Sequence, residues 1–153
     1  MYFHPALTTS AAMCVESWLW CASGAVGFSE AESEQRPSPE RWTRKEVVGH
    51  LIDSASNNHQ RFVRAQQTTS LSFPPYEQNH WVASQHYNER SWNDLVALWH
   101  AYNSHLAHVI ANIDDRHLAT QCVIESSNPV TLEFLAADYV AHLRHHLAQV
   151  GVV

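Results

Sequence analysis

Apolar side chains recur every three or four residues in four stretches of the chain, and this spacing places them on one face of an α-helix. The four stretches are residues 7–23, 43–66, 91–113 and 131–150. No stretch alternates apolar and polar residues over a convincing length, as a half-buried strand would. The pattern therefore predicts an all-α protein, and 153 residues suit a four-helix bundle with long connections.

The ends of these helices are marked by residues that satisfy free backbone groups. Thr43 and Glu46 have the spacing of a capping box, in which a hydroxyl and a carboxylate accept from the first amides of the helix. Ser91 and Asp94 repeat this spacing at the start of the third stretch. Gly151 follows the last stretch as a stop signal.

The connections between the helices differ in length. Residues 30–40 are polar and contain Pro37 and Pro39, which indicates a loop. Residues 67–90 form a longer connection, in which we expect one short helix over residues 77–84. Connections of this length in compact domains are often functional lids or crossovers.

Composition and charge limit the class of protein. We expect a single domain over residues 1–153. The formal net charge is −6 and the nine Lys and Arg residues form no cluster, so neither nucleic acid nor an anionic membrane is the expected partner. Three cysteines, an odd number, are typical of a reducing compartment and predict a cytoplasmic protein. The apolar stretch 11–28 lacks a basic leader and contains Glu16, so we expect neither a signal peptide nor a membrane span.

Histidine departs most from ordinary composition, with twelve in the chain. His142 and His146 are one helical turn apart beside the apolar stripe of the last predicted helix, whereas His145 points away from that stripe. Two imidazoles in this arrangement can reach one metal ion. They can also be two histidines packed at the edge of a core, and the pair alone leaves both interpretations open.

The second predicted helix carries a polar stripe beside its apolar one. At 100° per residue, His50, Asn57 and Arg61 fall within about 40° of one another, and Asp53 lies one step further around. Such a stripe either lines a cavity or marks a boundary with solvent. The pattern does not decide between these two interpretations.

Four segments of the chain resemble the DinB/YfiT-like superfamily in the order in which they occur. They read WTRKEVVGHLIDS at 42–54, NNHQRF at 57–62, PYEQNHW at 75–81 and HLRHHLAQ at 142–149. The resemblance covers about residues 34–150, whereas the family's first helix is usually more polar than the stretch 11–28.

This resemblance implies a four-helix bundle with a histidine triad for a divalent metal ion. One histidine comes from the second helix and two come from the last, which corresponds here to His50, His142 and His146. Zinc or nickel is the expected metal, because both suit nitrogen ligands.

The residues and the family resemblance leave three functions open. The first two are metal-dependent enzymes that act on a small-molecule substrate, either as a hydrolase or as a transferase that uses a low-molecular-weight thiol. The third is a non-catalytic bundle that binds a metal or another ligand. Arg61 is a candidate for orienting an anionic substrate group, and Asp53 and Asp138 are candidates for orienting ligands or moving protons. Six tryptophans lead us to expect a homodimer, with some of them exposed at its interface.

Overall fold

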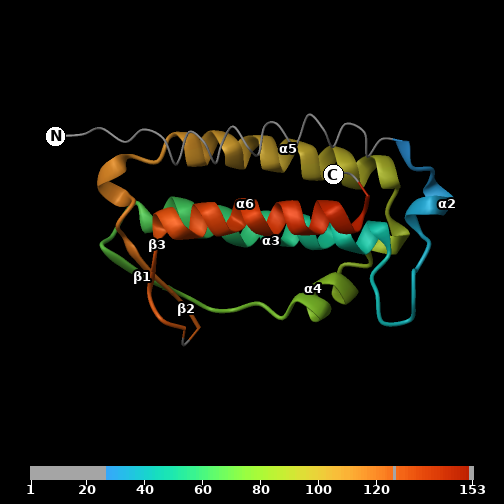
Figure 1. Ribbon diagram of the computed structural model, residues 1–153, viewed down its shortest axis with the longest axis horizontal. Coiled ribbons are helices and arrows are strands. Elements are labelled where there is room, and N and C mark those ends of the chain that lie inside the picture. Colours follow the sequence, from blue (N-terminus) through green and yellow to red (C-terminus); the bar gives the residue numbers. More distant parts are fainter. Residues whose placement is uncertain (1–26, 126, 152–153) are drawn as a thin grey trace.

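Three long helices form the body of the computed structural model, which describes residues 27–125 and 127–151. They are α3 (Arg44–Ala65), α5 (Trp92–Ala111) and α6 (Leu132–Gln149). They run side by side along the molecule, and α3 packs against both α5 and α6 (Figure 1). The mainly helical class is confirmed, while the helix predicted over residues 7–23 lies outside the described residues. Within the described ranges, no helix is both long and apolar enough to cross a membrane.

The predicted caps hold the ends of these helices. The hydroxyl of Thr43 accepts from the backbone N–H of Glu46 at 3.1 Å, and the Glu46 carboxylate accepts from the backbone N–H of Thr43 at 2.8 Å. Ser91 accepts from the N–H of Asp94, and Thr131 accepts from the N–H of Phe134. The three long helices therefore begin and end within about two residues of the predicted positions.

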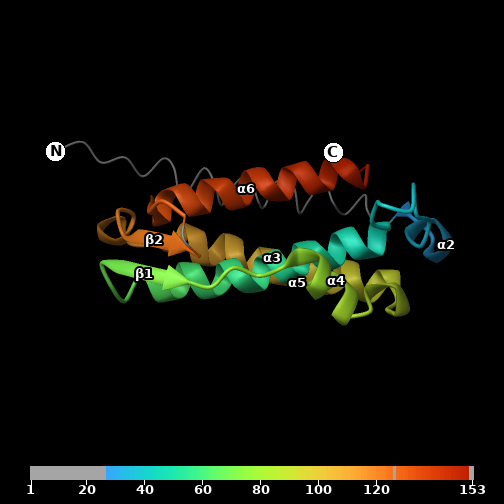
Figure 2. The ribbon, with the colours of Figure 1, turned by 90° about the horizontal axis from the view of Figure 1, so that it is seen from below.

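The prediction that the chain has no strand is wrong. Strands β1 (Ser70–Phe73), β2 (Gln121–Ile124) and β3 (Val130–Thr131) form a small sheet in the order β1-β2-β3. Strands β1 and β2 are parallel and β2 and β3 are antiparallel. Each strand is too short for alternation to appear in the sequence, and the parallel pair joins two distant connections. Figure 2 shows this sheet at one end of the bundle.

The connections contain further short elements. Residues 30–40 are not entirely a loop, because α2 (Glu30–Ser33) forms one turn there with its own capping box. The expected short helix is α4 (Gln78–Ser84), which begins after the cap Glu77. The 3-10 turns η2 (Tyr87–Glu89) and η3 (Asp115–His117) complete the described elements.

A close approach between Tyr87 and Gly49 fixes the η2 turn against α3. A Cβ atom at position 49 would lie 2.1 Å from Cδ2 of Tyr87, so only glycine leaves room for the ring. From this position the Tyr87 hydroxyl donates to Oδ1 of Asp53 at 2.6 Å. The space that Gly49 leaves therefore allows the Tyr87 hydroxyl to reach Asp53.

The tryptophans in the described residues lie mainly inside the molecule. Trp92 and Trp99 are among the most buried side chains, and Trp42 and Trp81 are partly buried. The homodimer stays a prediction, and these four residues add no exposed tryptophan to support it.

Candidate metal centre

Three histidines from α3 and α6 meet between the two helices. His50 is buried on α3, and His142 and His146 are half-buried on α6. One ring nitrogen of each lies within 4.8 Å of the others. The Nε2 atoms of His50 and His142 are 3.2 Å apart, and the three pairs of ring centroids are separated by 4.5–5.1 Å.

Helical geometry explains why these rings converge. His142 and His146 are four residues apart and therefore lie one above the other on the face of α6 that meets α3. His145 is exposed, and its Nε2 atom lies 3.0 Å from the amide nitrogen of Gln149. The structure thus brings together the three histidines that the family resemblance implies and leaves His145 outside. Their role as metal ligands stays a prediction.

The second nitrogen of two of these rings has a partner that fixes the orientation of the ring. Nδ1 of His146 donates to Oε1 of Gln149 at 2.9 Å, and Nδ1 of His142 lies 3.4 Å from the hydroxyl of Ser54. Partners of this kind hold a ligating imidazole in one orientation. Both contacts leave Nε2 free to face the centre of the cluster.

The three rings fit a divalent metal ion in protonation state and in spacing. Burial, with the nearby His146 and His142, lowers the pKa of His50 to about 3, and burial with neighbouring histidines lowers that of His142 to about 4. Burial also lowers the pKa of His146. The rings are therefore neutral at neutral pH, as metal ligands must be. Tetrahedral zinc with bonds of about 2.0–2.1 Å separates its nitrogen ligands by about 3.3 Å, close to the observed 3.2 Å.

The second ring nitrogen of His50 differs from those of His142 and His146. Its Nδ1 atom is buried and has no hydrogen-bond partner among the described residues. The ring of Trp42 lies against it, with centroids 5.0 Å apart. His50 therefore sits in a buried environment in which a charged ring is strongly disfavoured.

A cavity of about 390 Å³ opens beside His146. Its walls come from the segment before α3, from α4 and from the end of α6, and they include Arg41, Trp42, Asn79 and Gln149. This volume suits a small molecule. His80 and Trp81, which might overhang a cavity by their position in the sequence, do not line it: His80 is exposed and Trp81 packs on Tyr76 at 5.1 Å between ring centroids.

Comparison with known proteins identifies the family and the fold. The family model of the DinB superfamily matches residues 23–150. The chain belongs to the DinB superfamily. Among solved structures, YfiT from Bacillus subtilis superposes with a TM-score of 0.83 over 94% of this chain and 83% of YfiT, at 20% sequence identity. YfiT is described as a probable metal-dependent hydrolase with an unusual four-helix bundle topology, and the likeness shows a shared fold. No curated protein matches.

Asp53 of this DinB-superfamily chain is held by the η2 turn. Its Oδ1 atom accepts from the Tyr87 hydroxyl and from Nε2 of Gln85, each at 2.6 Å. Its Oδ2 atom is buried without a partner among the described residues. Burial raises the pKa of Asp53, and the two hydrogen bonds partly offset this rise. Sequence reasoning missed Gln85 and Tyr87, because neither belongs to a periodic pattern.

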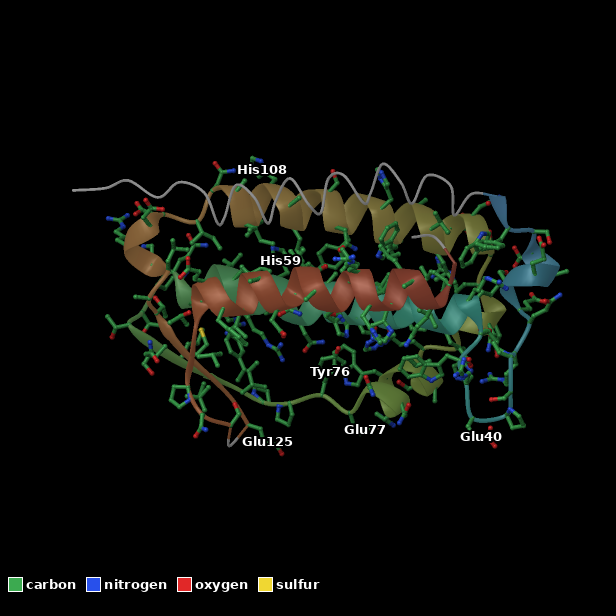
Figure 3. All side chains as sticks on the ribbon, in the orientation of Figure 1. Glu40, His59, Tyr76, Glu77, His108 and Glu125 are labelled. Carbon is green, nitrogen blue, oxygen red and sulfur yellow. The ribbon has the colours of Figure 1, made fainter. Side chains whose placement is uncertain are left out.

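Arg61 lies on the same face of α3 as His50, three turns further along. The side chain is 9% exposed, and burial lowers the pKa of its guanidinium. Asp138, another candidate from the sequence, is exposed, and no contact joins it to the triad in the part of the chain that the structure describes. Figure 3 places Tyr76, a polar neighbour of Arg61, on the side of the bundle that the β1–α4 connection crosses.

A second histidine cluster lies on the opposite face of α3. Nδ1 of His59 is 3.2 Å from the Tyr102 hydroxyl, and the rings of His59 and His105 are 5.1 Å apart. His59 follows His50 by nine residues, which turns it by about 180° around the helix, and Figure 3 shows it on the side toward α5. Sequence reasoning missed this cluster because its members lie on two helices. It is separate from the candidate metal centre.

Proposed function

We propose that this protein is a divalent-metal-dependent enzyme that hydrolyses a small molecule at His50, His142 and His146. The observation that supports this proposal is the convergence of three neutral imidazoles beside an open cavity. Three protein ligands leave a coordination position open, as catalytic sites do and closed structural sites do not. A divalent ion held there would supply Lewis-acid activation of a water molecule at neutral pH.

The residues around the triad would orient its rings, shield it from solvent and contact the substrate. Ser54 and Gln149 hold the rings of His142 and His146 in the orientation that presents Nε2. Trp42 covers the ring of His50 and limits the access of solvent to it. The cavity walls offer polar groups of Asn79 and Gln149 for orienting the substrate.

Two other functions are outcomes of the same test. A transferase that uses a low-molecular-weight thiol is supported by family resemblance alone, because no described residue identifies the thiol. A non-catalytic metal-binding bundle would share the triad and lack turnover. Hydrolysis is favoured because the fold is that of YfiT, which is itself described as a probable metal-dependent hydrolase.

The test begins with metal analysis of the purified full chain and continues with zinc-loaded and nickel-loaded protein. Each form is assayed against a panel of small esters and amides, and against an electrophile with and without a low-molecular-weight thiol. We expect metal-dependent ester or amide hydrolysis that is absent in His142→Ala and retained in His145→Ala. Turnover only in the presence of the thiol would replace hydrolysis by thiol transfer. Stoichiometric metal without any turnover would leave a binding protein.

A further inference from the structure

Arg61 is a buried cation that has no matching anion in the part of the chain that the structure describes. Among the described residues its guanidinium makes one hydrogen bond, from Nη1 to Oδ1 of Asn58 at 3.4 Å, although a guanidinium has five N–H donors. No acidic group in the described residues comes within 4.0 Å of it. Because burying a charge is costly unless it is paired, a residue in this state is expected to have a partner that is not part of the fold.

The groups around Arg61 do not supply that partner. The phenol of Tyr76 and the thiol of Cys122 are near enough to influence the guanidinium, but burial raises the pKa of both, so they are neutral at neutral pH. The exposed carboxylate of Asp138 acts only from a distance beyond ion-pair contact. The ring of Phe73 lies with its centroid 6.0 Å from Cζ of Arg61 and is apolar. The local charge is therefore positive.

A line of polar groups leads from Arg61 to the triad. The phenol of Tyr76 lies close enough to Ser54 to interact with it, and the Ser54 hydroxyl in turn lies 3.4 Å from Nδ1 of His142. Ser54 and Arg61 are two turns apart on one face of α3, about 10 Å at 1.5 Å per residue. Side chains on a helix lean toward its N-terminus, which brings the guanidinium closer to the triad than its Cα atom.

We propose that the small-molecule ligand of this protein carries a carboxylate or phosphate group, and that Arg61 binds this group while the reacting part of the ligand lies at the triad. The planar guanidinium matches the two oxygens of either anion with parallel hydrogen bonds. Tyr76 and Ser54 lie between the two ends. This inference rests on the proposed function for the position of the reacting end, whereas the anion subsite itself does not require a metal.

The test measures anion binding by calorimetry on the full chain, both zinc-loaded and after removal of metal by a chelator. The probes are inorganic phosphate and succinate, with succinamide as the uncharged analogue, all at equal ionic strength. The variants are Arg61→Gln, Arg61→Lys and the matched control Arg64→Gln. Arg64 lies on the same helix and is exposed, and within the described ranges its side chain bonds to Gln60 alone.

We expect metal-free wild-type protein to bind phosphate or succinate, and the stronger of the two identifies the kind of anion. Arg61→Gln should weaken this binding at least tenfold, Arg61→Lys should weaken it less, and Arg64→Gln should leave it unchanged. Succinamide should not bind. Arg61→Lys keeps the charge and so preserves the test if Arg61→Gln fails to fold, which circular dichroism would reveal.

Two results would overturn the inference. One is binding that disappears when the metal is removed and is insensitive to Arg61, since the anion would then sit on the metal. The other is no binding at all, or equal loss in Arg61→Gln and Arg64→Gln. Failure of the proposed function is a different result, namely wild-type protein that holds no metal or shows no turnover while the metal-free protein still binds the anion through Arg61.

Discussion

Helix α3 buries two positively charged side chains and surrounds them differently. The ammonium of Lys45 donates to Glu34 at 2.8 Å, to the backbone oxygen of Asn88 at 3.2 Å and to Glu30. Arg61 makes one long hydrogen bond to Asn58. Both side chains are well buried, at 1% and 9% exposed. Burial lowers the pKa of each, but the bonds to Glu30 and Glu34 raise that of Lys45 by more, so the two pKa values move in opposite directions.

This difference extends to the rest of the helix. The side of α3 that meets α2 and η2 pairs the ammonium of Lys45 and Oδ1 of Asp53 within the fold, and only Oδ2 of Asp53 stays buried without a partner among the described residues of that side. The side that meets α6 leaves Nδ1 of His50 and most of the Arg61 donors without partners among the described residues. We infer that the paired side serves stability and the unpaired side serves a ligand.

The largest expected effect is the loss of metal binding on the unpaired side. His142→Ala and His146→Ala should each weaken binding of zinc by more than about 100-fold. Loss of a residue that only orients a metal ligand already lowers metal affinity by about 10- to 100-fold, and loss of the ligand itself lowers it further. His145→Ala should leave the affinity near that of the wild-type protein, since its ring lies outside the cluster. Competition with a chromophoric chelator measures all three. Equal loss in all three variants would show that the exposed His145 is also a ligand.

The next largest effect is acid destabilisation of the metal-free protein. His50 and His142 have pKa values of about 3 and about 4 in the folded state, below the ordinary value of 6.5 that applies when the chain is unfolded. Below pH 6.5 the unfolded chain therefore binds more protons than the folded protein does. The contribution of these two neutral histidines to the free energy of unfolding is fully present above pH 6.5 and is lost as the pH falls toward 4. The free energy of unfolding should fall by up to about 1.4 kcal/mol per pH unit for each histidine.

Urea unfolding at several pH values between 7 and 5 would measure this slope, because ordinary carboxyl groups titrate below that range. A His50→Gln, His142→Gln double variant should have a shallower slope than the wild-type protein. An unchanged slope in the double variant would assign the acid sensitivity to other groups, such as His59, whose pKa is lowered by burial and by His105.

A smaller effect separates the two buried cations directly. Lys45→Met should lower the free energy of unfolding by about 1–3 kcal/mol, less than for a fully buried pair because Glu30 and Glu34 are themselves about half exposed. Arg61→Met should leave stability unchanged or raise it by about 1 kcal/mol, since an apolar side chain replaces an unpaired buried charge. Denaturant unfolding measures both. Comparable losses in the two variants would contradict a ligand role for Arg61.

The smallest effect concerns the cap of α3. Thr43→Ala removes the hydroxyl that accepts from Glu46 and should lower the free energy of unfolding by about 1 kcal/mol. Metal affinity should not change, because the cap lies on the paired side of the helix. Thr69→Ala, at an exposed position, is the control and should have no measurable effect. A loss of metal affinity in Thr43→Ala would show that the two sides of α3 are coupled.

Local sequence signals were sufficient for the long helices. Their caps and periodicity are properties of neighbouring residues, and the positions of His142 and His146 follow from the helical repeat alone. The strands could not be found in this way, because the pairing of Leu71 with Cys122 is set by packing between distant segments. The turn at α2 carried the same capping signal as α3 in Ser29 and Glu32, but the prolines that follow it made the segment look like a loop.

The site was predictable to a similar degree. Family resemblance named the triad, and the helical angle of Arg61 indicated its face of α3. Whether an anion lies beside Arg61 in the described residues depends on which side chains the segments between the helices bring near it. The spacing of residues along one helix cannot predict this. The same holds for Asp53, whose partners Gln85 and Tyr87 come from a connection that folds back on α3.

The parallel pairing of β1 and β2 closes a segment of chain that contains α4 and the whole of α5. Closing a loop of this length costs entropy before the pairing forms any bond, so we expect the sheet to form after α3 and α5 have packed and to open before they separate. Amide hydrogens at Cys122 and Val123 should then exchange faster than those in the middle of α3. Because Phe73 at the end of β1 lies near Arg61, such an opening would admit a ligand to the guanidinium while the helices stay packed.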